Sequence, residues 1–298
     1  MTATPAIPHT GKPTSARTPG PRTRGRFAPS TIPWDLVLAI AGTAIFAVAA
    51  IWPQLIATQG PFTMDLAASL QPPSAAHWFG TDESGRDLYS RVVYGTRESL
   101  GIGIGAAAVS LSLAIVLGTL AALGGRVASA VVGWLLEVAF SFPALLLSLL
   151  LIAVLGPSAL TQVLAVGVGT APGYARMVRG QILTARGSAY VEAAVALGHP
   201  RGRILRRHIL PNALRPLVAI FALSIGQSIV WASSLSFLGL GVAPPSPEWG
   251  ALLDAGRAYI TEAGWLTVIP GLVIVLLALT ATTLGRHLQL FLEKGEKA

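Results

Sequence analysis

The sequence contains no cysteine and few charged residues. Without cysteine, the 298-residue chain cannot form disulfides, zinc–thiolate sites or iron–sulfur clusters, and it has no thiol chemistry. Charged residues make up only 11% of the chain, against roughly a quarter in soluble domains, whereas 53% of the residues are hydrophobic. This composition predicts a membrane-spanning protein rather than one or two soluble domains.

The sequence also lacks the short motifs of common hydrolases and nucleotide-binding proteins. It has no HExxH pair, no GxSxG elbow and no P-loop glycine–lysine pattern. We therefore predict no catalytic residue, no metal site and no cofactor in this chain, so any ATP and Mg that it depends on must be bound by a partner protein. The histidines are scattered along the sequence, at His9, His77, His199, His208 and His287.

Six apolar stretches are long enough to cross a bilayer as helices. A hydrocarbon core about 30 Å thick needs roughly 20 apolar residues in a helix. The predicted fold is therefore all-α, an integral membrane protein with six transmembrane helices. The six stretches are 35–57, 99–123, 130–155, 159–178, 213–238 and 265–290.

Basic residues are concentrated in alternate segments between these stretches. Residues 176–215 carry eight arginines, and the proline-rich tail carries five basic residues and no acid. Because Lys and Arg favour cytoplasmic loops, both termini are predicted to be cytoplasmic, and the net charge of +8 needs no nucleic-acid partner. The predicted division is a disordered tail 1–33, a first transmembrane helix 34–57, an extracytoplasmic segment 58–98, a core 99–290 with a cytoplasmic loop at about 179–212, and a cytoplasmic tail 291–298.

The predicted spans are almost free of charge. Ion- and proton-coupled carriers keep charged residues inside the bilayer, so a stand-alone secondary transporter or channel is the weaker alternative. Glu137 is the main exception, either as a helix-end acid or as a gating residue. Gly101 and Gly105 predict close helix packing in the second span. A polar stripe in the fifth span either lines a pathway or makes helix–helix hydrogen bonds; its members are Ser224, Gln227, Ser228, Ser233 and Ser234.

The large cytoplasmic loop predicts two short helices. Residues 188–197 favour a helix in which the small side chains of Ala193 and Ala194 leave room for a partner surface. Gly198 then tolerates the backbone conformation that ends helices. Pro200 suits the first turn of a second helix, and Pro211 marks the turn into the fifth span.

This loop resembles the EAA signature of permease subunits of ATP-binding-cassette (ABC) importers. The likeness lies in Glu192-Ala193-Ala194, in the glycine at Gly198, and in the later Leu210-Pro211. His208 departs from the general signature, which has an apolar residue there, but His in an H-I-L-P-N run is common in the peptide branch. By this resemblance the coupling residues toward an ATPase are Tyr190, Glu192, Ala193, Ala194, Gly198, His208, Leu210, Pro211 and Asn212.

A second motif precedes the second span. Residues 79–87 resemble the FGTDxxGRD segment of the dipeptide/oligopeptide/nickel permeases. Two interpretations are open: a loop that satisfies its own polar groups, or a receptor-docking or gate segment. The residues concerned are Gly80, Thr81, Asp82, Gly85, Arg86 and Asp87.

Together these motifs imply a type I ABC importer permease in a bacterial cytoplasmic membrane. The resemblance implies a second homologous permease, two ABC ATPases or one fused ATPase, an extracytoplasmic solute-binding protein and membrane lipid as partners. It implies a peptide as the cargo, with nickel, haem or another small solute as alternatives. The ending Gly285-Arg286-His287 departs from the family pattern, and no role is assigned to it.

Overall fold

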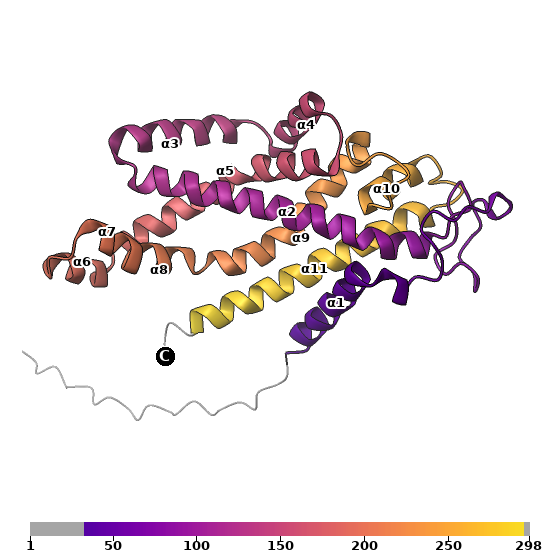
Figure 1. Cartoon of the computed structure of the whole chain (residues 1–298), viewed down its shortest axis with the longest axis horizontal. Coiled ribbons are helices and arrows are strands. Elements are labelled where there is room, and N and C mark those ends of the chain that lie inside the picture. The colour runs from indigo at the N-terminus through magenta and orange to yellow at the C-terminus, as the bar shows by residue number, and fades with distance from the viewer. Residues whose placement is uncertain (1–32, 295–298) are drawn as a thin grey trace, which may run out of the picture. The chain divides into compact units, whose positions relative to one another are not determined.

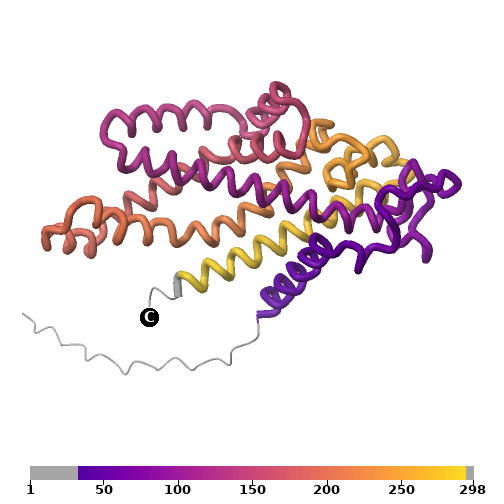
Figure 2. Tube along the Cα trace, in the orientation of Figure 1, coloured from indigo at the N-terminus to yellow at the C-terminus, as the bar shows by residue number. Residues whose placement is uncertain are grey.

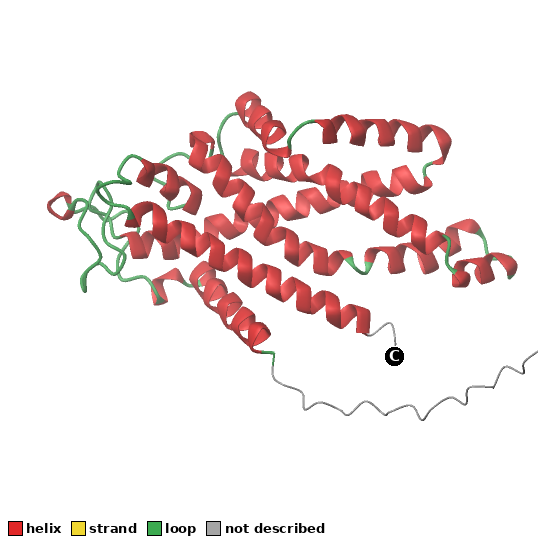
Figure 3. Cartoon of the chain, turned by 180° about the vertical axis from the view of Figure 1, so that it is seen from behind, coloured by secondary structure: helices red, strands yellow, loops and turns green. Residues whose placement is uncertain are grey.

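The computed structural model describes residues 33–294, and this part of the chain is helical (Figure 1). Within it there is no β-strand, only one isolated bridge between Thr81 and Asp87, so the predicted all-α class is confirmed (Figure 3). The predicted disorder of the tail concerns residues outside the described range. The helices are α1 (Trp34–Ile51), α2 (Leu88–Leu123), α3 (Gly125–Ser141), α4 (Ala144–Leu155), α5 (Ala159–Arg186), α6 (Ala189–Ala196), α7 (Arg201–Ile204), α8 (Leu210–Leu214), α9 (Leu217–Leu235), α10 (Trp249–Arg257) and α11 (Trp265–Lys294). Short 3-10 turns are η1 (Pro53–Leu55) and η2 (Leu66–Ala68), and π-helical turns are η3 (Leu205–Ile209) and η4 (Ser236–Leu240).

Four helices in the described residues are long and apolar enough to cross a membrane. They are α1, α2, α9 continued through η4, and α11; the α3–α4 pair makes a fifth if it counts as one span. Helix α5 has the length but carries Gln162, Arg176 and Arg179. The count of six spans and the cytoplasmic termini therefore stay predictions.

The expected third span, 130–155, is two helices that meet at an angle of 91° (Figure 2). The break lies at Phe142 and Pro143. Phe142 has an extended backbone with ψ 134°, as expected of a residue that precedes proline. Because Pro143 has no N–H to donate, the ladder of helical hydrogen bonds stops there. The composition of this segment was apolar throughout, so its length alone suggested an uninterrupted helix.

Close packing of α2 forms the centre of the helix assembly. A Cβ on Gly118 would come within 2.7 Å of the Ala175 carbonyl oxygen of α5, and a Cβ on Gly103 within 2.2 Å of Ile229 of α9. Gly105 also packs closely, 3.2 Å from Val163, but Gly101 faces open space. The predicted close packing of the second span is thus real at Gly103 and Gly105 rather than at a Gly101–Gly105 pair.

Two groups of segments lie at opposite ends of the helices (Figure 1). One end carries α6, α7 and α8, and the other carries the loop before α2 together with α10. The helical stretch from α7 through α8 contains Pro211, and the interruption before α9 falls at Arg215 and Pro216 instead of at Pro211. Near the end of α11, the His287 ring nitrogen Nε2 lies 2.8 Å from the Asp35 carboxylate of α1. The Gly285-Arg286-His287 segment, to which no role was assigned, thus contacts α1 through His287.

Candidate functional site

Helix α6 ends in a hydrogen-bonded glycine stop. Gly198 has a φ of +74°, in the left-handed region that glycine tolerates. Its N–H donates to the Val195 carbonyl at 2.9 Å, and the N–H of His199 donates to the Ala194 carbonyl at 3.2 Å. This pair of bonds is a Schellman motif, so the predicted helix and its stop are both present. A Cβ at Gly198 would meet no atom within 4 Å, so the constraint there is the backbone angle and not space.

One face of α6 is anchored in a hydrophobic cluster. Val191 and Ala194 are 5% and 4% exposed and pack in the same cluster as Ile182 of α5 and Ala114 of α2. Ile204 and Ile209 of the following turns belong to it as well. The segment α6–α8 therefore packs in one hydrophobic cluster with residues of α2 and α5.

The opposite face of α6 is exposed and largely apolar. Leu197 is 76% exposed and Val195 60%, and Tyr190 is also exposed. Glu192 and Ala193 lie on this exposed face, and Glu192 makes no side-chain hydrogen bond to another described residue. Large apolar side chains gathered on a water-facing surface mark a site for a partner. The EAA motif predicted Tyr190, Glu192 and Ala193 as coupling residues. It did not predict Val195 and Leu197, because the EAA pattern does not specify these positions.

The remaining motif residues of this loop shape the segment after Gly198. His208 lies in the π-helical turn η3, and its ring stacks near that of His199, with centroids 6.2 Å apart. The Asn212 side-chain amide donates to the His208 carbonyl at 2.8 Å. Leu210 and Pro211 begin α8. These residues belong to the turns that follow α6 and not to α6 itself.

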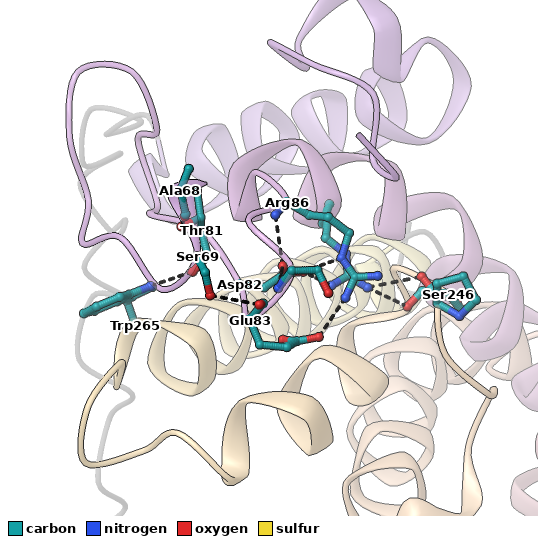
Figure 4. A network of polar contacts seen from close by, with 11 residues as sticks. Ala68, Ser69, Thr81, Asp82, Glu83, Arg86, Ser246 and Trp265 are labelled. Carbon is teal, nitrogen blue, oxygen red and sulfur yellow. Dashed lines mark hydrogen bonds and ion pairs between the residues drawn. The ribbon is translucent and has the colours of Figure 1, made fainter. Parts of the chain in front are cut away.

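The external motif folds into a buried knot of ion pairs (Figure 4). The Asp82 carboxylate accepts hydrogen bonds from Arg86 Nε at 2.7 Å and from Arg91 Nη1, and from the N–H groups of Ser84 and Arg86. Arg86 also donates to Glu83 Oε1 at 2.8 Å. Arg91, from α2, reaches the Ser246 carbonyl beyond α9 at 3.3 Å. Asp82 therefore ties the loop to α2, and Arg91 ties α2 to the segment before α10.

Two further motif residues fix the start of α2 and the neighbouring turn. Asp87 caps α2 by accepting from the Ser90 N–H at 2.9 Å, and its other oxygen lies 3.0 Å from His77 Nδ1. This cap explains why α2 begins at Leu88, well before the expected span. Thr81 is fully buried; its hydroxyl donates to the Ala68 carbonyl and accepts from the Gln71 N–H.

The motif glycines are required by close backbone approach. A Cβ on Gly85 would lie 1.7 Å from the Asp65 carbonyl oxygen, and one on Gly80 would lie 2.7 Å from the Gln71 carbonyl oxygen. Both glycines also have positive φ. All six predicted residues of this segment are thus brought together, with geometry that satisfies its own polar groups. A receptor role stays a prediction.

In the described residues, no three His, Asp or Glu side chains lie close enough to hold a metal ion. Glu248, 1% exposed, caps α10 by accepting from the Gly250 and Ala251 N–H groups at 2.9 and 2.8 Å. Burial raises the pKa of Glu248, and the hydrogen bonds from these N–H groups oppose that rise.

Comparison with known proteins identifies the family of the chain. Residues 114–294 match the family described as "Binding-protein-dependent transport system inner membrane component". The chain is 42% identical over 231 residues to the probable D,D-dipeptide transport system permease protein DdpC of Escherichia coli (strain K12), covering 77% of each chain. It is 37% identical over 255 residues to the dipeptide transport system permease protein DppC of Alkalihalophilus pseudofirmus, covering 85% of this chain and 84% of that protein. A glutathione transport system permease protein of Pectobacterium atrosepticum is 40% identical over 217 residues, with 73% and 72% covered.

Solved structures share the fold at low sequence identity. An amino acid ABC transporter crystallised with histidines matches with a TM-score of 0.56 at 17% identity, covering 68% of this chain and 94% of that one. An inward-facing MetNI methionine ABC transporter matches with a TM-score of 0.55 at 19% identity, covering 67% and 95%. The predicted permease identity is therefore confirmed, and with it the non-enzymatic role. By its sequence match and its shared fold, the chain belongs to the inner-membrane components of binding-protein-dependent ABC transport systems.

Proposed function

We propose that this chain is one of two permease subunits in an ATP-driven peptide importer, and that α6 couples it to a cytoplasmic ATPase. The observation that carries the coupling role is the two-faced structure of α6. Its buried face is fixed to α2 and α5 through Val191 and Ala194, and its exposed face presents Val195 and Leu197. Burying a Leu or Val side chain contributes about 1.5–3 kcal/mol. Contact between these two side chains and an ATPase would therefore stabilise even a small interface.

The complete transporter in this proposal contains further subunits. Two ABC ATPases, or one fused ATPase, bind ATP and Mg; a second homologous permease completes the pathway; and an extracytoplasmic binding protein delivers the cargo. A peptide cargo is supported by the names of the relatives, which include dipeptide and glutathione permeases. On the external side, the exposed apolar residues Phe62, Met64 and Trp78 are the surface that a binding protein would meet, since the motif side chains are buried.

The test uses three variants of the assembled complex. Leu197→Asp places a charge on the exposed face without disturbing the buried one, and we expect it to abolish copurification with the ATPase and ATP-driven dipeptide uptake. Gly198→Val forces a β-branched residue into a left-handed backbone, at about 1–2 kcal/mol, and we expect uptake to fall while membrane insertion persists.

Gly198→Asn is the matched control, because asparagine enters the left-handed region readily and no neighbour within 4 Å opposes a side chain there. We expect it to transport near the wild-type rate. If Leu197→Asp copurified with the ATPase and imported dipeptide like the wild type, the coupling surface would be misassigned. If the wild-type complex imported no peptide at all, the cargo would be wrong and the coupling surface could still stand.

A further inference from the structure

Charged side chains lie together on the sides of α3 and α5 that face each other. Glu137 stands about 18 Å along α3 from Gly125, at 1.5 Å per residue. It shares a pocket of ≈ 400 Å³ with Arg179 of α5. One turn earlier on α5, the guanidinium carbon of Arg176 lies 4.2 Å from the ring centre of Phe140, which is one turn after Glu137 on α3.

None of these three charges is neutralised within the described residues, and neither is that of Arg126, which lines the same pocket as Glu137. Glu137 and Arg176 are exposed and form no ion pair there, and the Nε of Arg179 is buried with no hydrogen-bond partner. Guanidinium groups bind carboxylates through paired hydrogen bonds, so unpaired arginines beside one unpaired carboxylate form a site for a ligand of mixed charge.

The other apolar helices present a different outer surface. Among described residues, charged side chains of α1 and α11 occur only near the helix ends, and α9 has none. The exposed positions of α11 are apolar, for example Val268, Leu272 and Leu276. A charged group facing hydrocarbon is costly, so lipid suits the α11 surface and not the side that carries Glu137 and Arg176.

A second, aromatic pocket lies next to the charged one along α3 and α5, since Ala139 and Phe140 follow Glu137 and Met177 precedes Arg179. It has a volume of ≈ 520 Å³, lies at the break between α3 and α4, and includes Phe140, Tyr174, Met177, Gln227 and Trp231 in its lining. The Tyr174 hydroxyl donates to Gln227 Oε1 at 3.0 Å on an exposed side of the helices. Largely apolar and aromatic walls with a few placed polar groups are typical of ligand sites.

We propose that these two neighbouring pockets form a wall of the transport pathway and a contact site for zwitterionic peptides. In this site Glu137 binds the peptide ammonium group and Arg176, with Arg179, binds its carboxylate, while the aromatic residues accommodate apolar side chains. The inference rests on the proposed peptide import and adds the residues that the cargo touches. Of the polar stripe in α9, only Gln227 belongs to this wall; Ser224, Ser228 and Ser233 are buried between helices.

The absence of cysteine allows a direct test with single-cysteine variants in the assembled complex. Met177→Cys places a reporter in the aromatic pocket, and Leu272→Cys on α11 is the control on the lipid side. Inside-out vesicles expose the predicted cytoplasmic side to a membrane-impermeant sulfonated maleimide, without binding protein. We expect the Met177→Cys variant to be labelled and the Leu272→Cys variant to remain unlabelled.

Cargo contact is tested by protection of the reporter. Alanylalanine should slow labelling of the Met177→Cys variant severalfold, whereas N-acetylated, C-amidated alanylalanine should not. Adding Glu137→Gln to the reporter should remove the protection while labelling without peptide stays fast.

The possible failures have different meanings. An unlabelled reporter, in a complex that still imports peptide, would overturn the pathway assignment. A labelled reporter with protection unchanged by Glu137→Gln would overturn the role of Glu137. Failure of the wild-type complex to import any peptide would instead contradict the proposed function.

Discussion

The sharpest prediction concerns Asp82, the acceptor at the centre of the external knot. Its side chain is 3% exposed and pairs with Arg86 and Arg91, which are 7% and 4% exposed. Asp82→Asn keeps the size but offers the arginines one carbonyl oxygen and confronts them with an N–H₂ group. Leaving a buried ion pair without one partner costs about 3–5 kcal/mol. That corresponds to roughly a hundredfold to several-thousandfold loss in the ratio of folded to unfolded protein.

The matched control is Glu83→Gln, on the other side of Arg86. Glu83 is 31% exposed and makes a single side-chain contact with Arg86, and glutamine keeps an oxygen that accepts the hydrogen bond from Arg86. The measurement is the thermal midpoint of the detergent-solubilised complex, followed by size-exclusion chromatography. We expect a large decrease for Asp82→Asn and almost none for Glu83→Gln. Equal midpoints for the two variants would refute the buried-knot interpretation. The same logic makes Arg86 a poor probe of receptor docking, since its loss would act through folding.

Two further predictions concern helix contact and pH. Gly42→Leu should push α1 from α11, because a Cβ added at Gly42 would lie 2.9 Å from Thr280 Oγ1. Gly133→Leu is the control, because a Cβ added at Gly133 would meet no atom within 4 Å. A lowered thermal midpoint for the first variant alone would bear this out. Burial raises the pKa of Glu248 in the folded protein above its ordinary 4.5. The protonated carboxyl therefore makes its full contribution to stability below pH 4.5, and this contribution is lost as pH rises through the pKa of the folded protein. Glu248→Gln should therefore gain thermal stability relative to the wild type as pH rises, and a difference independent of pH would count against this.

Much of the fold could be predicted from the lengths of the apolar stretches and from a few glycines and prolines. Helix α11 begins at the predicted residue and ends four residues after the predicted span, whereas α1 ends at Ile51, six residues before the predicted end, because a 3-10 turn begins at Pro53. The division of the third span did not follow, since Pro143 inside an apolar run is compatible with a kink as well as with a break. The early start of α2 depends on the Asp87 cap, a polar contact that span prediction by hydropathy does not consider.

The candidate site was predictable where a backbone requirement dictates the residue. Gly198 and Gly85 could be singled out because their conformations need glycine. What each motif contacts could not be predicted, since it depends on tertiary packing: Asp82 meets Arg91 of α2, and α6 leaves Leu197 exposed. Arg91 was not among the predicted site residues, although it joins the loop before α2 to the segment before α10.

The helix α2 joins the two ends of the molecule mechanically. Its 36 residues extend about 54 Å at 1.5 Å per residue. One end is capped by Asp87 and held through Arg91, and the other packs through Ala114 and Ala121 into the cluster that anchors α6. Its closest approaches to α5 are through small residues such as Gly118, which leaves little room for the two helices to slide. If α6 couples to an ATPase as proposed, we expect its displacement to move α2 and α5 together, because all three share one hydrophobic cluster. We then expect one power stroke to alter both the Asp82 knot and the α5 side of the Glu137 pocket.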